Sequence, residues 1–453
     1  MAAPGRGPGG LGLRDMLTSD TVGRAPLVSI AAAPVGLLLA TLLLSACAGD
    51  ELPETQSLTQ DGAWCWFQDP RAVYRKGDRE RTYMQWITRD GRLQVGAYDH
   101  VTGHTEIHTV KQDWDRDDHN VGAFVVRPDG RLMVFYARHN GHGLFARTAA
   151  HPEDIRTWGD EVIVSDADRI SYVHPVYLSD EDMYFAFWRG PSWKPTFATS
   201  TDGQSWSESQ ILIQEAGRED ADIRPYLKVS TDGVSSIHFA FTDGHPRDEP
   251  HNSVYYLRYQ QSRFTRADGA VIGALDSLPI RHSDSDLVYD ASETSVRAWV
   301  WDLALDANGA PVIAYTRLPG ERDHRYHYAR WTGTLWEDYE ISPAGRWFPE
   351  TPVGTVEPEP HYSGGIDLHP SNPSIALLSR QRGNGFEIER WLTPDGGRTW
   401  EWQSITRSTE GLNVRPVVPE SSRPGDYVVL WMAGPYVHYT DYSTGIRLAR
   451  LID

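Results

Sequence analysis

The chain has 453 residues, of which 40% are hydrophobic and 11% aromatic, a composition typical of a folded protein and not of a disordered one. It carries 43 basic and 62 acidic side chains, a formal net charge of −19, so it has no general basic excess with which to bind nucleic acid. Its 17 Trp and 21 Tyr supply flat apolar rings, which fill cores and also stack on the faces of sugars.

The first segment with a clear pattern is an apolar run at residues 27–46, preceded by arginines and followed by Cys47. Small residues before a cysteine, after an apolar run with basic flanks, are typical of a bacterial lipoprotein signal. We expect a signal peptide over 1–46, cleavage before Cys47 and a lipid on its thiol. The secreted protein would then be anchored on the outer side of the cytoplasmic membrane or at the cell surface. An uncleaved signal anchor is the alternative, and translation starts at either Met1 or Met16.

If Cys47 carries the lipid, Cys65 is the only other cysteine, so neither an internal disulfide nor a zinc site with several cysteines is expected. Cys65 lies between two tryptophans and is interpreted as a small buried hydrophobic residue. Residues 47–60 are interpreted as a linker. No later segment reaches the ~20 apolar residues of a membrane span.

From residue 61 to residue 453, short β-rich runs alternate with clusters of turn residues. A strand, a tight polar turn and an aromatic-rich strand recur seven times, at intervals of about 50 to 75 residues, which indicates a propeller or array. Further strand pairs between these hairpins make about four strands per repeat. We therefore predict an all-β fold, a seven-bladed β-propeller of four-stranded antiparallel blades, with six or eight blades as alternatives. The seven turns lie at 76–78, 127–130, 179–182, 230–233, 306–309, 369–372 and 423–426.

Two segments, 200–206 and 393–400, share a Ser or Thr, an Asp, a Gly and a closing Ser/Thr-Trp pair. They resemble the Asp-box turn of sialidase-type propellers, in which Asp and Gly fold a turn between strands and Trp packs between blades. The motif is architectural and is no evidence for sialidase chemistry, since no Tyr–Glu nucleophile pair is identifiable. The longest interval between hairpins predicts insertions near residues 243–298, as loops at the rim of the propeller.

The repeat also predicts which reactive side chains meet. Residues at equal distances before and after a hairpin turn lie side by side, at the end away from the turn. Neighbouring blades bring these ends to one mouth of the central channel. The set expected there is His119, His139, Tyr172, Arg189, Arg224 and Tyr226.

This set of histidine, tyrosine and arginine suits β-elimination from a uronic acid. The reaction needs a base for the C5 proton, a cation to neutralise the carboxylate and an acid for the departing O4 oxygen. Either arginine can pair the carboxylate through two hydrogen bonds, either neutral histidine can take the proton, and either tyrosine can transfer one. Hydrolysis would instead need two positioned carboxyl groups. Those available for it are Asp69, Asp117, Asp118 and Asp222.

Several strings resemble the BNR-repeat propeller family, which includes ulvan lyases, rhamnose–glucuronate lyases and a related rhamnosidase branch. The resemblance covers residues 61–445, and its most specific part is the Asp-Asp-His-Asn string at 117–120 with Arg-His-Asn at 138–140. The other strings are Gly62–Ala72 (GAWCWFQDPRA), Arg224–Tyr226 (RPY) and Tyr362–Gly365 (YSGG).

The resemblance implies the roles of individual residues. His119 and His139 match the two active-site histidines of the lyases, Arg189 matches the arginine that neutralises the carboxylate, and Tyr172 and Tyr226 match the two tyrosines. Further candidates for binding the substrate are Asn120, Arg224, His361 and Tyr362.

We therefore expect a monomeric polysaccharide lyase that cleaves anionic glycans beside a glucuronate or iduronate linked to rhamnose. His119 and His139 would be the proton-transfer pair, and Arg189 would hold the carboxylate. Endo and exo action both stay open. The alternatives are an exo-acting, rhamnosidase-like hydrolase on the same linkage, and a glycan-binding lipoprotein without catalysis.

No cofactor is required for this chemistry. Members of the family can carry a metal ion, however, so a structural metal stays open. The residues that offer ligand types, without a firm motif, are His245, His251, Asp302, His324 and His327.

Overall fold

The computed structural model describes residues 52–215, 217, 224–345, 358–360, 362–407 and 411–452. The predicted signal peptide, the lipidation site Cys47 and the candidate His361 lie outside these residues. The chain divides into two units, Met1–Gly49 and Asp50–Asp453, and the description below concerns the second. In the described ranges, no helix combines the length and apolar character that crossing a membrane requires.

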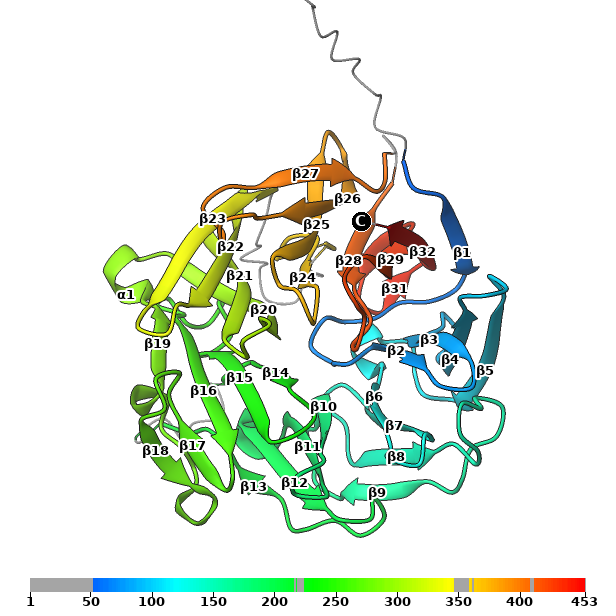
Figure 1. Cartoon of the computed structure of the whole chain (residues 1–453), viewed down its shortest axis with the longest axis horizontal. Coiled ribbons are helices and arrows are strands. Elements are labelled where there is room, and N and C mark those ends of the chain that lie inside the picture. Colours follow the sequence, from blue (N-terminus) through cyan, green and yellow to red (C-terminus); the bar gives the residue numbers. More distant parts are fainter. Residues whose placement is uncertain are drawn as a thin grey trace, which may run out of the picture. The chain divides into compact units, whose positions relative to one another are not determined.

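The second unit is a seven-bladed β-propeller of antiparallel sheets, as the repeat predicts (Figure 1). Blade one contains β2 (Ala72–Lys76), β3 (Glu80–Ile87), β4 (Leu93–Asp99) and β5 (Thr105–Lys111). Blade two contains β6 (Ala123–Val126), β7 (Leu132–Ala137), β8 (Leu144–Thr148) and β9 (Val162–Ser165). Blade three contains β10 (Ser171–Leu178), β11 (Met183–Arg189), β12 (Pro195–Ser200) and β13 (Gln210–Ile211).

The remaining blades follow the same order, with additions in blades four and seven. Blade four is built on β14 (Leu227–Thr231), β15 (Ser236–Thr242) and β16 (Val254–Gln260). Blade five contains β20 (Arg297–Leu305), β21 (Pro311–Gly320), β22 (Asp323–Trp331) and β23 (Trp336–Gly345). Blade six contains β24 (Ile366–Leu368), β25 (Ile375–Arg382), β26 (Gly385–Leu392) and β27 (Glu401–Ser404). Blade seven contains β28 (Asn413–Val417), β29 (Asp426–Ala433), β32 (Gly445–Ile452) and β1 (Thr55–Thr59).

Each of the seven predicted turns joins the first two strands of one blade. The turn at 127–130, for example, links β6 to β7, and the backbone N–H of Gly130 donates to the carbonyl of Arg127 (2.9 Å). Gly130 has a φ of 81°, which a residue without Cβ adopts at little cost. The turn chemistry in the sequence therefore located the inner hairpin of every blade.

The two Asp-box segments are turns between the third and fourth strands of blades three and six. The carboxylate of Asp202 accepts hydrogen bonds from the backbone N–H groups of Gln204 and Ser205. The ring of Trp206 then meets Phe135 of blade two edge-on, 5.6 Å between centroids. The second box places Trp400 against a tyrosine of blade five in the same way. Both tryptophans therefore pack between blades, as predicted.

Two parts of the fold depart from the regular repeat. The predicted insertion in blade four forms further strands and a short helix instead of loops alone: β17 (Arg263–Thr265), β18 (Val271–Ala274), β19 (Asp286–Tyr289) and α1 (Ala291–Thr294). In blade seven, residues 55–59, expected to belong to a linker, form β1 and pair with β32 as the outer strand. This pairing joins the beginning of the propeller to its last strand, so the ring of blades is closed by hydrogen bonds. The same blade carries an inserted hairpin, β30 (Tyr436–His438) and β31 (Asp441–Tyr442).

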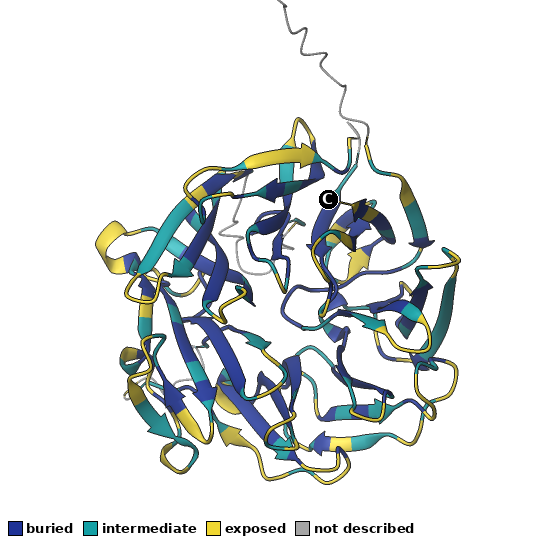
Figure 2. Ribbon diagram, viewed as in Figure 1, coloured by how far each residue is buried: buried dark blue, intermediate teal, exposed yellow. Residues whose placement is uncertain are grey.

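The inner strands of the blades are buried along most of their length (Figure 2). In one large hydrophobic cluster, the ring of Trp66 stacks on Trp301 of blade five, 4.3 Å between centroids and 17° between planes. Burial of such large rings favours folding through the apolar area removed from water. Most of the aromatic residues therefore belong to the core, which makes an aromatic ring left at the surface informative.

Candidate active site

His119 lies in a short 3₁₀ turn, Asp118–Asn120, just before β6. Asp117 caps this turn, because its side chain accepts a hydrogen bond from the backbone N–H of His119 (2.9 Å). Gly122 follows where no side chain fits, since a Cβ there would lie 2.3 Å from a carbonyl oxygen of β7. The turn therefore approaches β7 closely, and this brings His119 beside His139, which follows β7.

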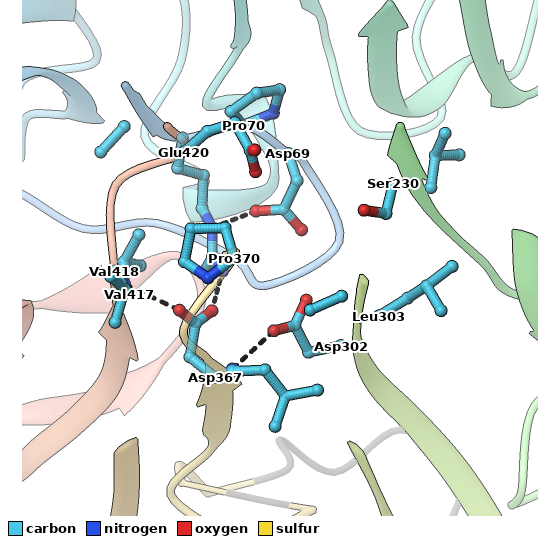
Figure 3. Close-up of a pocket in the computed structure, with 15 residues that line it drawn as sticks. Asp69, Pro70, Ser230, Asp302, Leu303, Asp367, Pro370, Val417, Val418 and Glu420 are labelled. Atoms are coloured by element: carbon cyan, nitrogen blue, oxygen red, sulfur yellow. Dashed lines mark hydrogen bonds and ion pairs between the residues drawn. The ribbon is translucent and has the colours of Figure 1, made fainter. Parts of the chain in front are cut away.

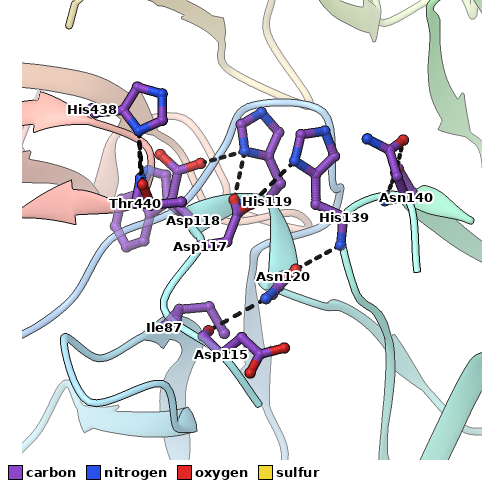
Figure 4. Close-up of polar contacts among 12 residues, drawn as sticks. Ile87, Asp115, Asp117, Asp118, His119, Asn120, His139, Asn140, His438 and Thr440 are labelled. Carbon is purple, nitrogen blue, oxygen red and sulfur yellow. Dashed lines mark hydrogen bonds and ion pairs between the residues drawn. The ribbon is translucent and has the colours of Figure 1, made fainter. Parts of the chain in front are cut away.

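The two imidazole rings stack, with centroids 4.1 Å apart and planes 9° apart, as the hairpin spacing predicts. Asp117 bridges them: Oδ1 lies 2.8 Å from Nδ1 of His119, and Oδ2 lies 3.1 Å from Nδ1 of His139 (Figure 4). A carboxylate only accepts hydrogen bonds, so each Nδ1 carries a proton. The Nε2 atoms, on the opposite side of each ring, are left as the reactive positions. The two side chains are 12% and 19% exposed, so a ligand can reach them.

The two histidines have different charge states. Burial opposes the charged form of His119, but Cys65, Tyr172 and the two aspartates of its turn raise its pKa well above the usual range. Burial and the adjacent charge of His119 lower the pKa of His139 to about 4. Two stacked imidazolium ions would repel each other. At neutral pH the pair therefore consists of a protonated His119 and a neutral His139, held together by Asp117.

Asp118, which is fully buried, connects the histidine turn to blade seven. Its Oδ2 accepts hydrogen bonds from Nη1 of Arg415 (2.8 Å) and from the hydroxyl of Tyr436, and its Oδ1 lies 2.9 Å from Nδ1 of His119. Arg415 also pairs with Glu359 (3.3 Å). This buried guanidinium is therefore neutralised by two carboxylates, and its role is to hold the turn in place.

Tyr172 and Arg189 reach the same site from blade three, as predicted. The pairing of β10 with β11 shifts register between Ser171 and His174, and Tyr172 within this irregular segment has a φ of 61°. Such a bulge re-aims side chains. The ring of Tyr172 lies 5.7 Å from that of His119, and the guanidinium of Arg189 lies 4.5 Å from the Tyr172 ring.

Arg189 is a buried cation, 5% exposed, whose hydrogen-bond partners among the described residues are all neutral. Its Nη1 donates to the hydroxyl of Tyr226 (2.9 Å). Its Nη2 donates to Oδ1 of Asn140 (2.6 Å) and contacts Oγ of Ser171 (3.2 Å), whereas its Nε lacks a hydrogen-bond partner in the described ranges. Buried arginines are almost always paired with an acid. The neutral partners around Arg189 therefore leave its charge available for an anionic ligand.

Arg224, predicted to bind substrate, lies just before β14 and is placed differently. Its guanidinium lies 5.5 Å from the ring of Trp193, which also has Arg189 at 4.6 Å. Unlike Arg189, it forms an ion pair, with Asp248. Arg189 is therefore the better candidate for holding a substrate carboxylate. The sequence analysis missed Trp193. The available signal was its position, four residues after the candidate Arg189 and in a loop that begins with Gly-Pro.

Tyr439, from the loop between β30 and β31, was also missed. Its ring meets His119 edge-on (4.8 Å, 88°) and lies 5.6 Å from His139. Its carbonyl oxygen accepts a hydrogen bond from the backbone N–H of Asp118 (3.0 Å). No repeat spacing relates Tyr439 to the histidines, because its hairpin is an insertion in the last blade.

Two residues predicted to bind substrate are almost completely buried. Asn120 is 2% exposed; its amide donates to the carbonyl of Trp114 (3.0 Å), and its Oδ1 accepts from the backbone N–H of His139 (2.6 Å). It therefore positions a histidine. Tyr362 is also 2% exposed, and its hydroxyl lies 3.2 Å from Nε2 of His245. These side chains have little surface left for a ligand.

A polar cavity lies where the inner strands of several blades meet (Figure 3). Four carboxylates line it: Asp69, Asp302, Asp367 and Glu420. Asp69 pairs there with Arg71 (3.0 Å) and Lys228, so it does not join the histidines. Asp222 lies outside the described residues. Of the carboxylates considered for hydrolysis, only those of Asp117 and Asp118 are therefore seen at the histidine pair.

The metal ligands suggested by the sequence do not gather into one site. Among the described residues, the acidic, histidine and cysteine side chains that lie within 4.8 Å of one another in threes are Cys65 with Asp118 and His119, and Asp117 with His119 and His139. Both oxygens of Asp117 are already occupied by the imidazole Nδ1 atoms. The geometry of this second group therefore fits proton transfer better than metal binding.

The comparison with protein families agrees with these motifs. A model described as "BNR repeat-containing family member" matches residues 81–344, more than half of the chain. The chain belongs to the BNR repeat-containing family. The resemblance inferred from the sequence motifs is thereby confirmed. The search of curated proteins found no match.

Among solved structures with a fold similar to that of this BNR-repeat protein, some are described as polysaccharide lyases. One described as a PL25 ulvan lyase bound to -[GlcA(1-4)Rha3S]- has a TM-score of 0.65 at 15% identity, over 88% of this chain and 93% of that chain. Another, described as polysaccharide lyase Uly1, has a TM-score of 0.56 at 11% identity, over 89% of this chain and 99% of that one. At such low identity these likenesses establish a shared fold.

Proposed function

We propose that the protein is a polysaccharide lyase that cleaves anionic glycans by β-elimination, beside a glucuronate or iduronate linked to rhamnose. The observation that carries the proposal is the buried, unpaired guanidinium of Arg189 near two stacked histidines that share Asp117. A cation held by neutral partners fits a substrate carboxylate, and the histidines provide a base and an acid side by side. The likeness to ulvan lyase structures and the family motifs support the same reading.

In the proposed reaction, Arg189 pairs the uronate carboxylate and stabilises the negative charge that develops there. Neutral His139 takes the C5 proton on Nε2. The electrons of the C5–H bond form the C4=C5 double bond, and the C4–O4 bond breaks. Protonated His119 donates its Nε2 proton to the departing O4. Proton exchange with solvent then restores both histidines.

The carboxylates favour elimination over hydrolysis. A glycosidase pair needs one carboxyl group as acid and a second as base or nucleophile. Asp117 has both oxygens on imidazole Nδ1 atoms, and Asp118 is fully buried against Arg415 and Tyr436. Neither is placed to attack a sugar or to activate water.

The proposal is tested by incubating the protein with ulvan and with a rhamnose-capped glucuronan. Elimination is followed by the ultraviolet absorbance of the unsaturated uronate, and all cleavage by reducing ends. We expect absorbance and reducing ends to rise together, and both to disappear in His119→Ala and His139→Ala. His142→Ala is the matched control, because this exposed histidine pairs only with acids at the surface. Reducing ends without absorbance would assign a hydrolase instead.

We also propose that the mature protein begins at Cys47 and is held at a membrane by lipid on that residue, with residues 1–46 removed as a signal peptide. The support is the sequence pattern of small residues before a cysteine after an apolar run. Cys47→Ser should move the protein from the membrane fraction to the soluble fraction and abolish fatty-acid labelling. Unchanged labelling in this variant would contradict the assignment.

A further inference from the structure

Trp402 is an aromatic side chain left at the surface of a protein that buries most of its rings. It is 48% exposed, whereas the other described Phe, Trp and Tyr residues are buried or half-buried. It lies on β27, the outer strand of blade six, which is exposed for most of its length (Figures 1 and 2). Single exposed apolar residues are ordinary at protein surfaces, so the surroundings of Trp402 decide its meaning.

Trp402 is part of a stack of flat groups on one face of blade six. It pairs across strands with Trp391, with ring centroids 5.9 Å apart and planes 17° apart. The guanidinium of Arg382 lies 4.7 Å from the Trp402 ring, and that of Arg380 lies 5.1 Å from the Trp391 ring. Cation–π contacts of this kind hold a ring in one orientation. The indole is therefore a fixed platform at the edge of the blade.

The accessible charge beside this platform belongs to an arginine. Arg380 and Arg382 share one carboxylate, that of Glu389, at 2.9 Å and 2.7 Å. Glu387 lies on the same face, opposite Arg380, and its carboxylate accepts hydrogen bonds from Thr406 and Asn413. Arg382, whose side chain is 40% exposed, therefore carries the accessible positive charge beside the Trp402 ring. Glu401 and Gln403, the neighbours of Trp402 on β27, point to the opposite face because side chains alternate along a strand.

We propose that Trp402 and Arg382 form a second glycan-binding site, which takes a uronate-containing polysaccharide chain. The exposed indole face stacks on the apolar C–H face of a sugar ring, and the guanidinium of Arg382 pairs the carboxylate of the same or the next sugar. The site goes beyond the proposed function, because it binds the polymer on blade six, away from the histidines. Engagement at two sites raises the effective concentration of a long chain at the catalytic centre.

The test is electrophoresis of the His139→Ala protein, which cannot cleave by the proposed mechanism, in gels that contain polyglucuronate. We expect retardation in polyglucuronate and none in gels with neutral dextran. Adding Trp402→Ala should weaken binding by about tenfold, as expected for the loss of an aromatic contact. Adding Arg382→Ala should weaken binding. It should also make the remaining binding less sensitive to salt concentration, because a charge–charge contact is lost. Trp402→Phe should keep most of the retardation.

The matched control is Leu335→Ala, which removes an exposed apolar side chain (53%) from blade five and should leave retardation unchanged. The absence of retardation in the His139→Ala protein, or equal retardation with and without Trp402, would overturn the proposal. The readout is independent of turnover, so a failure of the lyase assignment would not imitate either result. If the lyase assignment holds, Trp402→Ala should slow cleavage of the polymer and leave cleavage of short oligosaccharides unchanged.

Discussion

Replacing Asp117 by Asn keeps the shape of the side chain that bridges the histidines but removes its charge and one of its two acceptor oxygens. Asn can accept a hydrogen bond from only one imidazole Nδ1–H, and it presents an N–H to the other. The ring that faces this N–H must carry its own proton on Nε2. If that ring is His139, it can no longer take the C5 proton. If it is His119, that ring loses one of the two carboxylates that favour its protonated form.

The size of the effect follows from the role of the pair. A positioned general acid or base contributes about 10²–10⁴-fold to a rate. At about 1.4 kcal/mol for each factor of ten, this is about 3–6 kcal/mol of barrier. We therefore expect kcat of Asp117→Asn to fall by about 10²–10⁴-fold. KM should change little, because the partners of Arg189 stay in place.

The assay is the initial rate of ultraviolet absorbance with ulvan, with thermal unfolding followed by circular dichroism to show that the variant folds. Asp115→Asn is the matched control: this exposed carboxylate, two residues away, pairs with Arg138 (2.8 Å) and contacts neither histidine. It should keep the parent rate. A folded Asp117→Asn protein with an unchanged kcat would refute the reasoning, because the bridging carboxylate would then be dispensable.

The pH profile of kcat/KM should rise through about pH 4, where His139 loses its proton, and fall only well above pH 6.5, where His119 loses its own; a fall that begins below pH 6.5 would contradict these charge states. Arg189→Lys should lower kcat/KM by about 10–100-fold, since lysine keeps the charge but cannot donate two parallel hydrogen bonds to a carboxylate. Arg224→Lys is the control and should have less effect, because the charge of Arg224 is already paired with Asp248. Burial raises the pKa of Glu420 from 4.5 to about 7, so the folded protein favours its protonated form. This contributes at most about 3 kcal/mol to the free energy of unfolding. The contribution is complete below pH 4.5 and is lost as the pH rises through 7. Glu420→Gln should therefore flatten the decline of Tm between about pH 5 and about pH 8, and equal slopes in the two proteins would exclude this role.

Much of the fold was readable from local chemistry. A tight turn depends on residues that are adjacent in sequence, so the Asp, Asn, Gly and Pro clusters marked all seven inner hairpins. The same hairpins placed His119 beside His139 and Tyr172 near Arg189, because antiparallel pairing converts distances along the chain into contacts across strands. The Asp-box turns were predictable for the same reason.

The rest depended on contacts between segments that are distant in sequence. The sequence alone determined the repeat, the pairing of the two histidines and the residue types for proton transfer beside a carboxylate. The tertiary structure decided that Asp117 bridges both rings, that Arg189 is left with neutral partners, that Tyr439 from an inserted hairpin closes against the histidines, and that residues 55–59 complete the last blade. The contacts of Arg189 and Tyr439 depend on how separate blades meet, and the other two depend on side-chain geometry and on pairing between the two ends of the chain. Local turn and strand preferences carry no information about any of these.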